Sequence, residues 1–173
     1  MRGTKKRLVF WGGVLSLAVG VLIVAGVGPA IGEDEAAQRL LATCEWRGTE
    51  IQKLSAVQAL GKLDTKAGYA ALESIATGRD GPLAARACVA MGQANYPGAK
   101  QALMRLFEDP KRSHAARVGA FVAYARAEIA AGTAWSAVEA YGLGHCDKGS
   151  KLEASILAAK NGISAAQRRS GGR

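Results

Sequence analysis

The chain is poor in the residues that most metal and enzyme sites need. It holds two histidines and three cysteines in 173 residues. A structural zinc site takes four ligands from spaced Cys and His pairs, and none of the usual spacings occurs here. No Gly-rich phosphate loop follows a strand, and no Ser, His and acid set stands in a recognisable context. We therefore expect no cofactor, no metal site and no enzymatic activity.

Aromatic residues are also scarce, at 6% of the chain, whereas glycine occurs 22 times. Strands favour β-branched and aromatic side chains, so this composition suits closely packed helices better than a sheet. The length allows one domain and a targeting segment. The predicted fold class is all-α.

Acidic residues are missing from the amino-terminal segment. Four basic residues lie in 1–7, and residues 8–32 carry no charge before Glu33. This run is long enough to cross a bilayer as a transmembrane anchor, while Ala30 and Gly32 fit a cleaved signal peptide. A buried soluble helix is the third interpretation. In the first two, the positive-inside rule places the rest outside the cytoplasm, in a single-pass cell-membrane protein or a periplasmic or secreted one.

The rest of the chain is only mildly basic. Beyond residue 32 it carries 19 basic and 14 acidic side chains, a net charge of +5. Such a charge, spread along a series of helices, is typical of a soluble surface. Nucleic acid is therefore not an expected partner.

A self-similar segment organises the chain after residue 48. Residues 56–61 read AVQALG, residues 87–92 read ACVAMG, and residues 120–125 read AFVAYA, at spacings of 31 and 33. A period between about 20 and 50 residues indicates stacked structural units. The second helix of the unit repeats in the same register, at Leu72 and Ile75 and then at Leu103 and Leu106.

Helix start signals divide this region. A capping helix is predicted over residues 34–46, with its acidic residues at the end that the helix dipole favours. N-caps are expected at Thr49, Ser113 and Ser150, with Gln52 and Glu153 completing capping boxes. The first repeat helix is predicted to contain Gly61. The domain division is 1–32 for the anchor or signal peptide, 33–166 for the helical repeats and 167–173 for a flexible tail.

The pattern resembles the HEAT repeat family in its short bacterial form, with one Ala-x-x-Ala-Leu-Gly motif per repeat. The likeness covers about residues 49–162, and the third and fourth units depart from it. The resemblance implies a right-handed α-solenoid of stacked helical hairpins that serves as a scaffold for other proteins. It specifies a fold far better than a function. The residues that carry it are Ala56, Ala59, Leu60 and Gly61, then Ala87, Ala90, Met91 and Gly92, and more weakly Ala120, Ala123, Tyr124 and Ala125.

The cysteines and histidines fit this arrangement without a special role. Cys88 stands at the core position of Val57, which predicts a small buried hydrophobe, and a bridge between Cys44 and Cys146 would join opposite ends of the stack. We expect no disulfide. His145 and Cys146 are predicted to lie in a loop between repeats, while His114 is predicted to be solvated in the first turn of a helix.

Function is predicted as contact rather than catalysis. The leading hypothesis is an extracytoplasmic, membrane-anchored or secreted scaffold that binds a protein partner and touches the membrane through residues 8–32 if these are uncleaved. Alternatives are a structural accessory subunit of a larger membrane or envelope complex, and a small enzyme or ligand carrier that uses His145 and Cys146. Corresponding turns of stacked units align along one edge, so the basic residues near these turns form either a solvated edge or a partner-binding ridge. These residues are Arg79, Arg86, Lys111, Arg112 and Arg117.

Overall fold

The computed structural model describes residues 32–45, 48–63, 65–78, 81–94 and 96–170, with side chains as far as residue 163. The chain divides into two compact units, Met1–Gly32 and Glu33–Arg173, and almost all described residues belong to the second. The predicted anchor or signal segment, residues 8–32, lies outside the described residues apart from Gly32. Among the helices that the structure describes, none is long and apolar enough to cross a membrane.

The described residues are all-α, which confirms the predicted fold class. They form eight helices and no strand. The helices are α2 (Glu33–Glu45), α3 (Glu50–Leu60), α4 (Lys66–Thr77), α5 (Gly81–Gln93), α6 (Ala99–Glu108), α7 (His114–Ala130), α8 (Trp135–Gly144) and α9 (Lys151–Ser170).

Side-chain caps determine where α3 and α7 begin. The Thr49 hydroxyl accepts a hydrogen bond from the Gln52 N–H, and the Gln52 side chain accepts one from the Thr49 N–H at 2.9 Å. This confirms the predicted capping box, which satisfies two backbone donors at the open end of the helix. Ser113 is the N-cap of α7, also as predicted, and accepts from the Ala116 N–H at 3.2 Å.

The start of α9 differs slightly from the prediction. The Ser150 hydroxyl accepts from the Glu153 N–H at 3.1 Å, as an N-cap should. The Glu153 carboxylate accepts from the Gly149 N–H instead of the Ser150 N–H. Gly149 has a φ of +78°, a conformation that glycine adopts at no steric cost, and this turn presents its N–H to the carboxylate.

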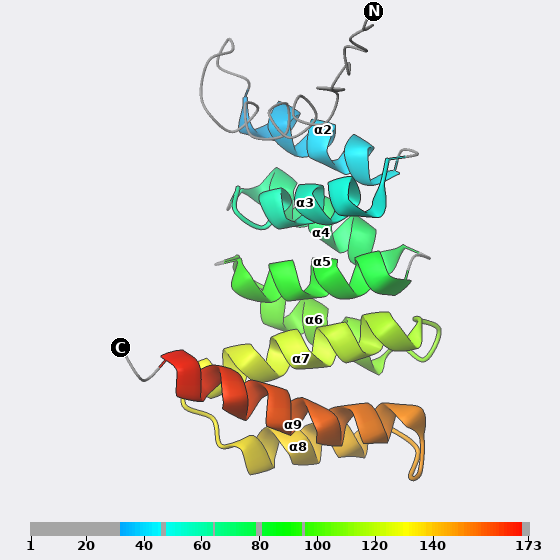
Figure 1. The fold of residues 1–173 in the computed structure, drawn as a ribbon, viewed down its shortest axis with the longest axis vertical. Helices are drawn as coiled ribbons and strands as arrows, with labels where there is room; N and C mark the ends of the chain where they lie inside the picture. Colours follow the sequence, from blue (N-terminus) through cyan, green and yellow to red (C-terminus); the bar gives the residue numbers. More distant parts are fainter. Residues whose placement is uncertain (1–31, 46–47, 64, 79–80, 95, 171–173) are drawn as a thin grey trace, which may run out of the picture. The chain divides into compact units, whose positions relative to one another are not determined.

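The helices of the second unit pack in two rows. We call α3, α5, α7 and α9 the odd row and α4, α6 and α8 the even row; the odd row faces the viewer in Figure 1. Each odd-row helix packs on the next one, while α4 packs on α5, α6 on α7 and α8 on α9. Helix α2 packs on α3 and α4. Packing therefore links elements that are near in sequence.

Small residues set the spacing of the odd row. A Cβ added to Gly92 would lie 2.8 Å from the Ala123 Cβ, and one added to Gly61 would lie 3.0 Å from the Ala90 Cβ. Side chains larger than hydrogen do not fit at such separations without moving the helices apart. The same glycine–alanine contact thus occurs in two successive layers, at positions 31 and 33 residues apart.

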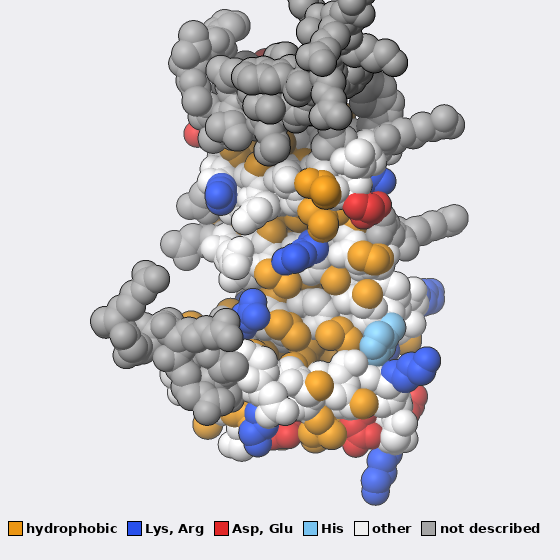
Figure 2. Space-filling view, in the orientation of Figure 1, with side chains coloured by type: hydrophobic (Ala, Val, Ile, Leu, Met, Phe, Trp, Pro, Cys, Tyr) orange, Lys and Arg blue, Asp and Glu red, His pale blue; other side chains and the backbone are white. Residues whose placement is uncertain are grey.

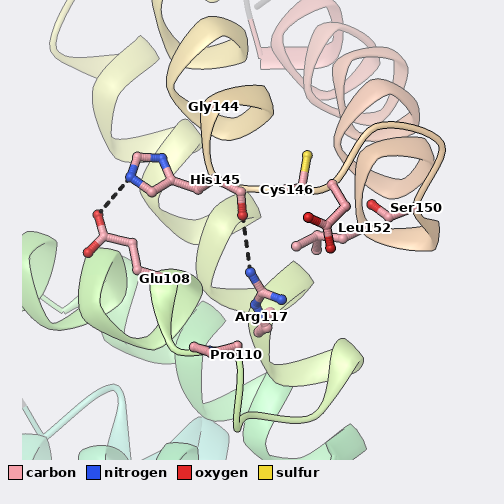
Figure 3. Close-up of a pocket in the computed structure, with 9 residues that line it drawn as sticks. Glu108, Pro110, Arg117, Gly144, His145, Cys146, Ser150 and Leu152 are labelled. Atoms are coloured by element: carbon pink, nitrogen blue, oxygen red, sulfur yellow. Dashed lines mark hydrogen bonds and ion pairs between the residues drawn. The ribbon is translucent and has the colours of Figure 1, made fainter.

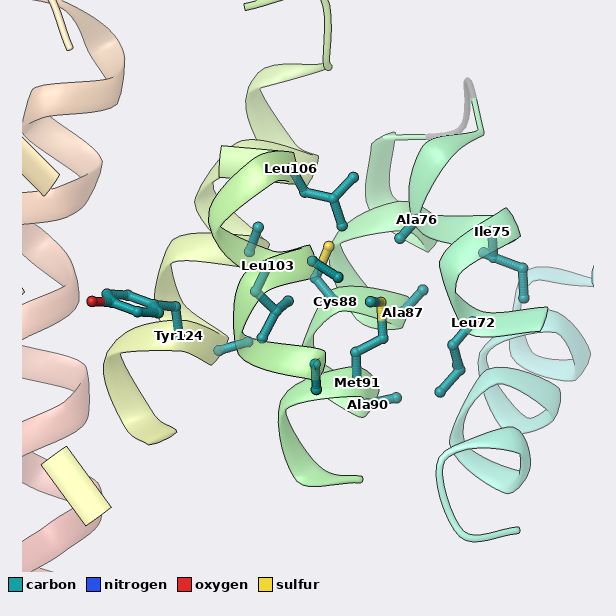
Figure 4. Packing of buried hydrophobic residues seen from close by; sticks show 14 of the residues in the cluster. Leu72, Ile75, Ala76, Ala87, Cys88, Ala90, Met91, Leu103, Leu106 and Tyr124 are labelled. Atoms are coloured by element: carbon teal, nitrogen blue, oxygen red, sulfur yellow. The ribbon is translucent and has the colours of Figure 1, made fainter. Parts of the chain in front are cut away.

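Apolar side chains fill the space between the rows. Leu72, Cys88 and Met91 are fully buried, and Leu103 and Leu106 are nearly so. Figure 4 shows these side chains from α4, α5 and α6 converging in one layer. The burial of Cys88 confirms its predicted role as a small hydrophobe.

Aromatic rings fill the space between α6, α7 and α8. Helix α7 has 17 residues against 13 in α5. The Phe107 ring lies 5.2 Å from that of Phe121 and 5.9 Å from that of Tyr141, and the Tyr141 ring lies 5.0 Å from that of Tyr124. Trp135 meets Phe121 edge-on at 6.4 Å. Such tilted ring pairs stabilise the packing beyond what the burial of their surface contributes. They take the place of the leucines that fill the preceding repeats.

Two boundaries depart from the sequence prediction. Gly61 is the C-cap of α3 instead of lying inside it, because Thr65 already caps α4 four residues later. The short turn leaves no room for a longer α3. At the other end, α9 extends to Ser170, into the segment predicted as a tail, and residues 171–173 lie outside the described part.

Candidate functional surfaces

The predicted basic ridge separates into residues with different surroundings. Arg79 lies outside the described residues. Lys111 is exposed in the turn between α6 and α7, and Arg86 is exposed on α5. Arg112 and Arg117 are half-buried, and both donate hydrogen bonds within the chain.

Arg112 ties neighbouring turns together. Its Nε lies 3.0 Å from the Asp109 carboxylate, and its terminal nitrogen donates to the Thr77 carbonyl at the end of α4. Carbonyls in the last turn of a helix have no partner within the helix. The hydrogen bond from the Lys111 N–H, together with Arg112, lowers the pKa of Asp109. Arg112, which lies in the turn between α6 and α7, thus caps the carboxyl end of α4.

Arg117 makes an equivalent link between α6, α7 and the end of α8. Its Nε donates to the Phe107 carbonyl at 2.8 Å, and its Nη2 donates to the His145 carbonyl at 3.3 Å. The guanidinium also lies 5.8 Å from the centre of the Phe107 ring, within the range of a cation–π contact. One side chain of α7 therefore holds the carboxyl ends of α6 and α8. A partner contact by Arg112 or Arg117 stays a prediction.

A pocket lies beside Arg117, where the ends of α6 and α8 meet the turn before α9. Its volume is about 320 Å³. Figure 3 shows His145 reaching toward Glu108 on one side, with Cys146 and Ser150 on the other. The structure thus brings the predicted His145 and Cys146 together with acidic groups and an arginine. The pocket is lined by Glu108, Pro110, Arg117, Gly144, His145, Cys146, Asp147, Ser150 and Leu152.

Both ring nitrogens of His145 have neighbours. Nδ1 lies 2.8 Å from the Tyr141 carbonyl, and Nε2 lies 3.5 Å from Glu108 Oε1. A carbonyl can only accept, so Nδ1 carries a proton. The same Glu108 oxygen accepts from the Tyr141 hydroxyl at 2.7 Å, and burial, followed by the Glu108 carboxylate, raises the pKa of Tyr141. This arrangement joins α6 to α8 and directs the imidazole toward Glu108.

The cysteine next to it, Cys146, is half-buried. The Cys146 thiol donates to the Leu143 carbonyl at 3.5 Å, and burial is the first cause that raises its pKa. A nucleophilic cysteine needs the opposite shift, since the thiolate is the reactive form. The geometry of His145 and Cys146 therefore offers little support for thiol chemistry.

The other two thiols are buried. Burial raises the pKa of Cys88 to about 12 and also raises that of Cys44. All three cysteines are free in the structure. In the part of the chain that the structure describes, no group of three or more His, Cys, Asp or Glu could hold a metal ion.

Two polar links between helices have no signal in the sequence. Lys100 pairs with Glu128, which also accepts from the Thr133 hydroxyl at 2.9 Å, and Glu108 pairs with Tyr141 33 residues away. Neither pair forms a local sequence motif, because its two members lie on different helices. In the sequence, only the expected alignment of corresponding turns along one edge indicated this part of the surface.

Comparison of the chain with protein-family models, with curated proteins and with solved structures returned no match.

Proposed function

We propose that residues 33–166 form a HEAT-like α-solenoid that acts outside the cytoplasm as a non-enzymatic scaffold for a protein partner. The observation that carries the proposal is the repeated glycine–alanine contact, Gly61 on Ala90 and then Gly92 on Ala123. This contact repeats the same packing of one odd-row helix on the next. It leaves a series of similar helix faces exposed to solvent. Repeated units of this kind create extended binding surfaces.

The polar groups favour this proposal over a small enzyme. Arg112 and Arg117 bond to carbonyls, His145 faces Tyr141 and Glu108, and burial raises the pKa of Cys146. The two arginines and the contact between His145 and Glu108 link different helices. The basic residues in 1–7 and the uncharged run 8–32 support the extracytoplasmic location.

Site-specific photo-crosslinking in the native cell tests the proposal. A photoreactive amino acid replaces one exposed residue at a time: Gln93 on the odd row, Gln101 on the even row and Lys111 in a turn. A scaffold gives a discrete protein adduct from at least one position, because one face lies against the partner. Folded full-length protein that gives no adduct from any of the three positions refutes the proposal.

A further inference from the structure

The odd row presents unusually apolar strips to solvent. On α3, Ile51, Leu54, Ser55 and Gln58 share one face by their spacing of three, four and seven residues. Ile51 is 76% exposed. A surface helix normally turns charged or polar residues outward, and the exposed Ile51 departs from this pattern.

The next two helices continue the pattern. The outward strip of α5 holds Ala85, Arg86 and Val89, again at helical spacing. That of α7 holds Val122 and Arg126, with Val118 at its edge, where it also packs against the core. The four apolar residues are partly exposed, and both arginines are exposed. Each strip thus combines small or branched apolar side chains with a single arginine.

These strips form one continuous face. A Cβ on Gly119 would lie 2.9 Å from the Ala85 Cβ, and one on Gly92 would lie 2.8 Å from the Ala123 Cβ. Helices α5 and α7 are therefore in close contact along their length, with their residue numbers increasing in the same direction. Figure 2 shows this face, with hydrophobic side chains across α3, α5 and α7 and scattered Lys and Arg among them. We call it the odd-row face.

On α5 and α7 the unpaired charge of this face is basic, whereas on α3 the exposed Glu50 lies next to Ile51 in the first turn. Helix α5 contains no Asp or Glu, and the acidic Glu128 of α7 is paired with Lys100 and Thr133. Arg86 and Arg126 make no ion pair with any residue that the structure describes. Arg86 lies in the first half of α5 and Arg126 in the last third of α7, so the two cations lie toward opposite ends of the face.

We infer that the odd-row face docks an amphipathic segment of a partner protein whose apolar residues are flanked by Asp or Glu. This rests on the proposed scaffold function and names its binding face. Exposed apolar patches mark interaction sites, and the unpaired, exposed arginines of α5 and α7 favour a partner of opposite charge. Arg86, one of the five residues of the predicted ridge, belongs to this face, and Arg126 joins it.

The test maps crosslinks and then changes the face. Photoreactive residues at Gln58 and Gln93 probe the odd-row face, and those at Gln101 and Lys111 probe the even row and the turn, in full-length protein in the native cell. The crosslinked peptide is sequenced from the adduct. The expected peptide comes from another protein, has apolar residues at helical spacing and carries Asp or Glu beside them.

Two variants and a matched control complete the experiment. Val89→Glu combined with Val122→Glu, and separately Arg86→Glu combined with Arg126→Glu, should each lower the Gln93 adduct yield about tenfold. Gln101→Glu on the even row should leave it unchanged, and unaltered thermal unfolding shows that each variant is folded. Adducts from Gln101 or Lys111 alone overturn the inference but leave the scaffold proposal standing, and adducts from no position overturn both. A lipid adduct, a second copy of this chain or a peptide without acidic residues at Gln58 and Gln93 also overturns the inference.

Discussion

Replacing Gly119 by alanine should push α5 and α7 apart. A Cβ at this position would lie 2.7 Å from the Ala85 Cα, 2.8 Å from the Ala85 carbonyl oxygen and 2.9 Å from the Ala85 Cβ. Two of these atoms belong to the backbone, so no side-chain rotation can relieve the clash. The helices themselves must move.

The magnitude follows from two opposing effects. Overpacking a tight interface costs about 1–3 kcal/mol, and three contacts below 3.0 Å place this case toward the upper end. Alanine in a helix gains about 1 kcal/mol over glycine. The expected net loss in the free energy of unfolding is therefore about 1–2 kcal/mol, which lowers Tm by roughly 3–8 °C in a domain of this size.

Thermal unfolding of the full chain in mild detergent, followed by circular dichroism, measures the effect. Gly162→Ala is the matched control, since a Cβ there has no neighbour within 4 Å and the variant should gain stability by up to about 1 kcal/mol. Equal or higher stability of Gly119→Ala relative to wild type would refute the close approach of the two helices.

Three further predictions concern polar groups. Arg117→Gln should lower the free energy of unfolding by about 1–2 kcal/mol, since the part-buried Phe107 carbonyl and the exposed His145 carbonyl lose their charged donor, and chemical denaturation checks this. Glu128→Gln should cost up to about 1 kcal/mol at pH 7. The hydrogen bond from Lys100 lowers the pKa of Glu128 from its ordinary value, so its stabilisation is complete above the ordinary carboxylate pKa and disappears as the pH falls through the lowered one. A difference in Tm that persists unchanged at pH 3 would contradict this assignment. Cys88 should resist maleimide until the protein unfolds, because its thiol is fully buried with a pKa of about 12; mass spectrometry of labelled peptides measures the rate.

Local chemistry made much of the fold predictable. Thr49 and Ser113 act as N-caps because their hydroxyls satisfy backbone donors within three residues. The burial of Cys88 follows from its place in the repeated motif, where Val57 and Phe121 are buried as well. These features depend on residues that are close in sequence or related by one repeat.

The surface was harder to predict because its contacts connect different layers. Arg112 bonds to Thr77 35 residues away, and Arg117 bonds to His145 28 residues away. From the sequence both were assigned to a partner-binding ridge with Arg86, since a charge near a turn looks the same whether it caps a carbonyl or faces solvent. The outward strips of α5 and α7 were equally hidden, as valines in a helix of mixed composition give no sign of which side the next helix covers.

The most direct test of the account compares crosslink yields at Gln93, Gln101 and Lys111 in one set of native cells. These positions sample the odd row, the even row and the turns of the same folded domain. We expect a discrete protein adduct at Gln93 whose yield exceeds the yields at the other two positions. Absence of a protein adduct at all three positions would contradict the proposal that this chain works by binding a protein partner.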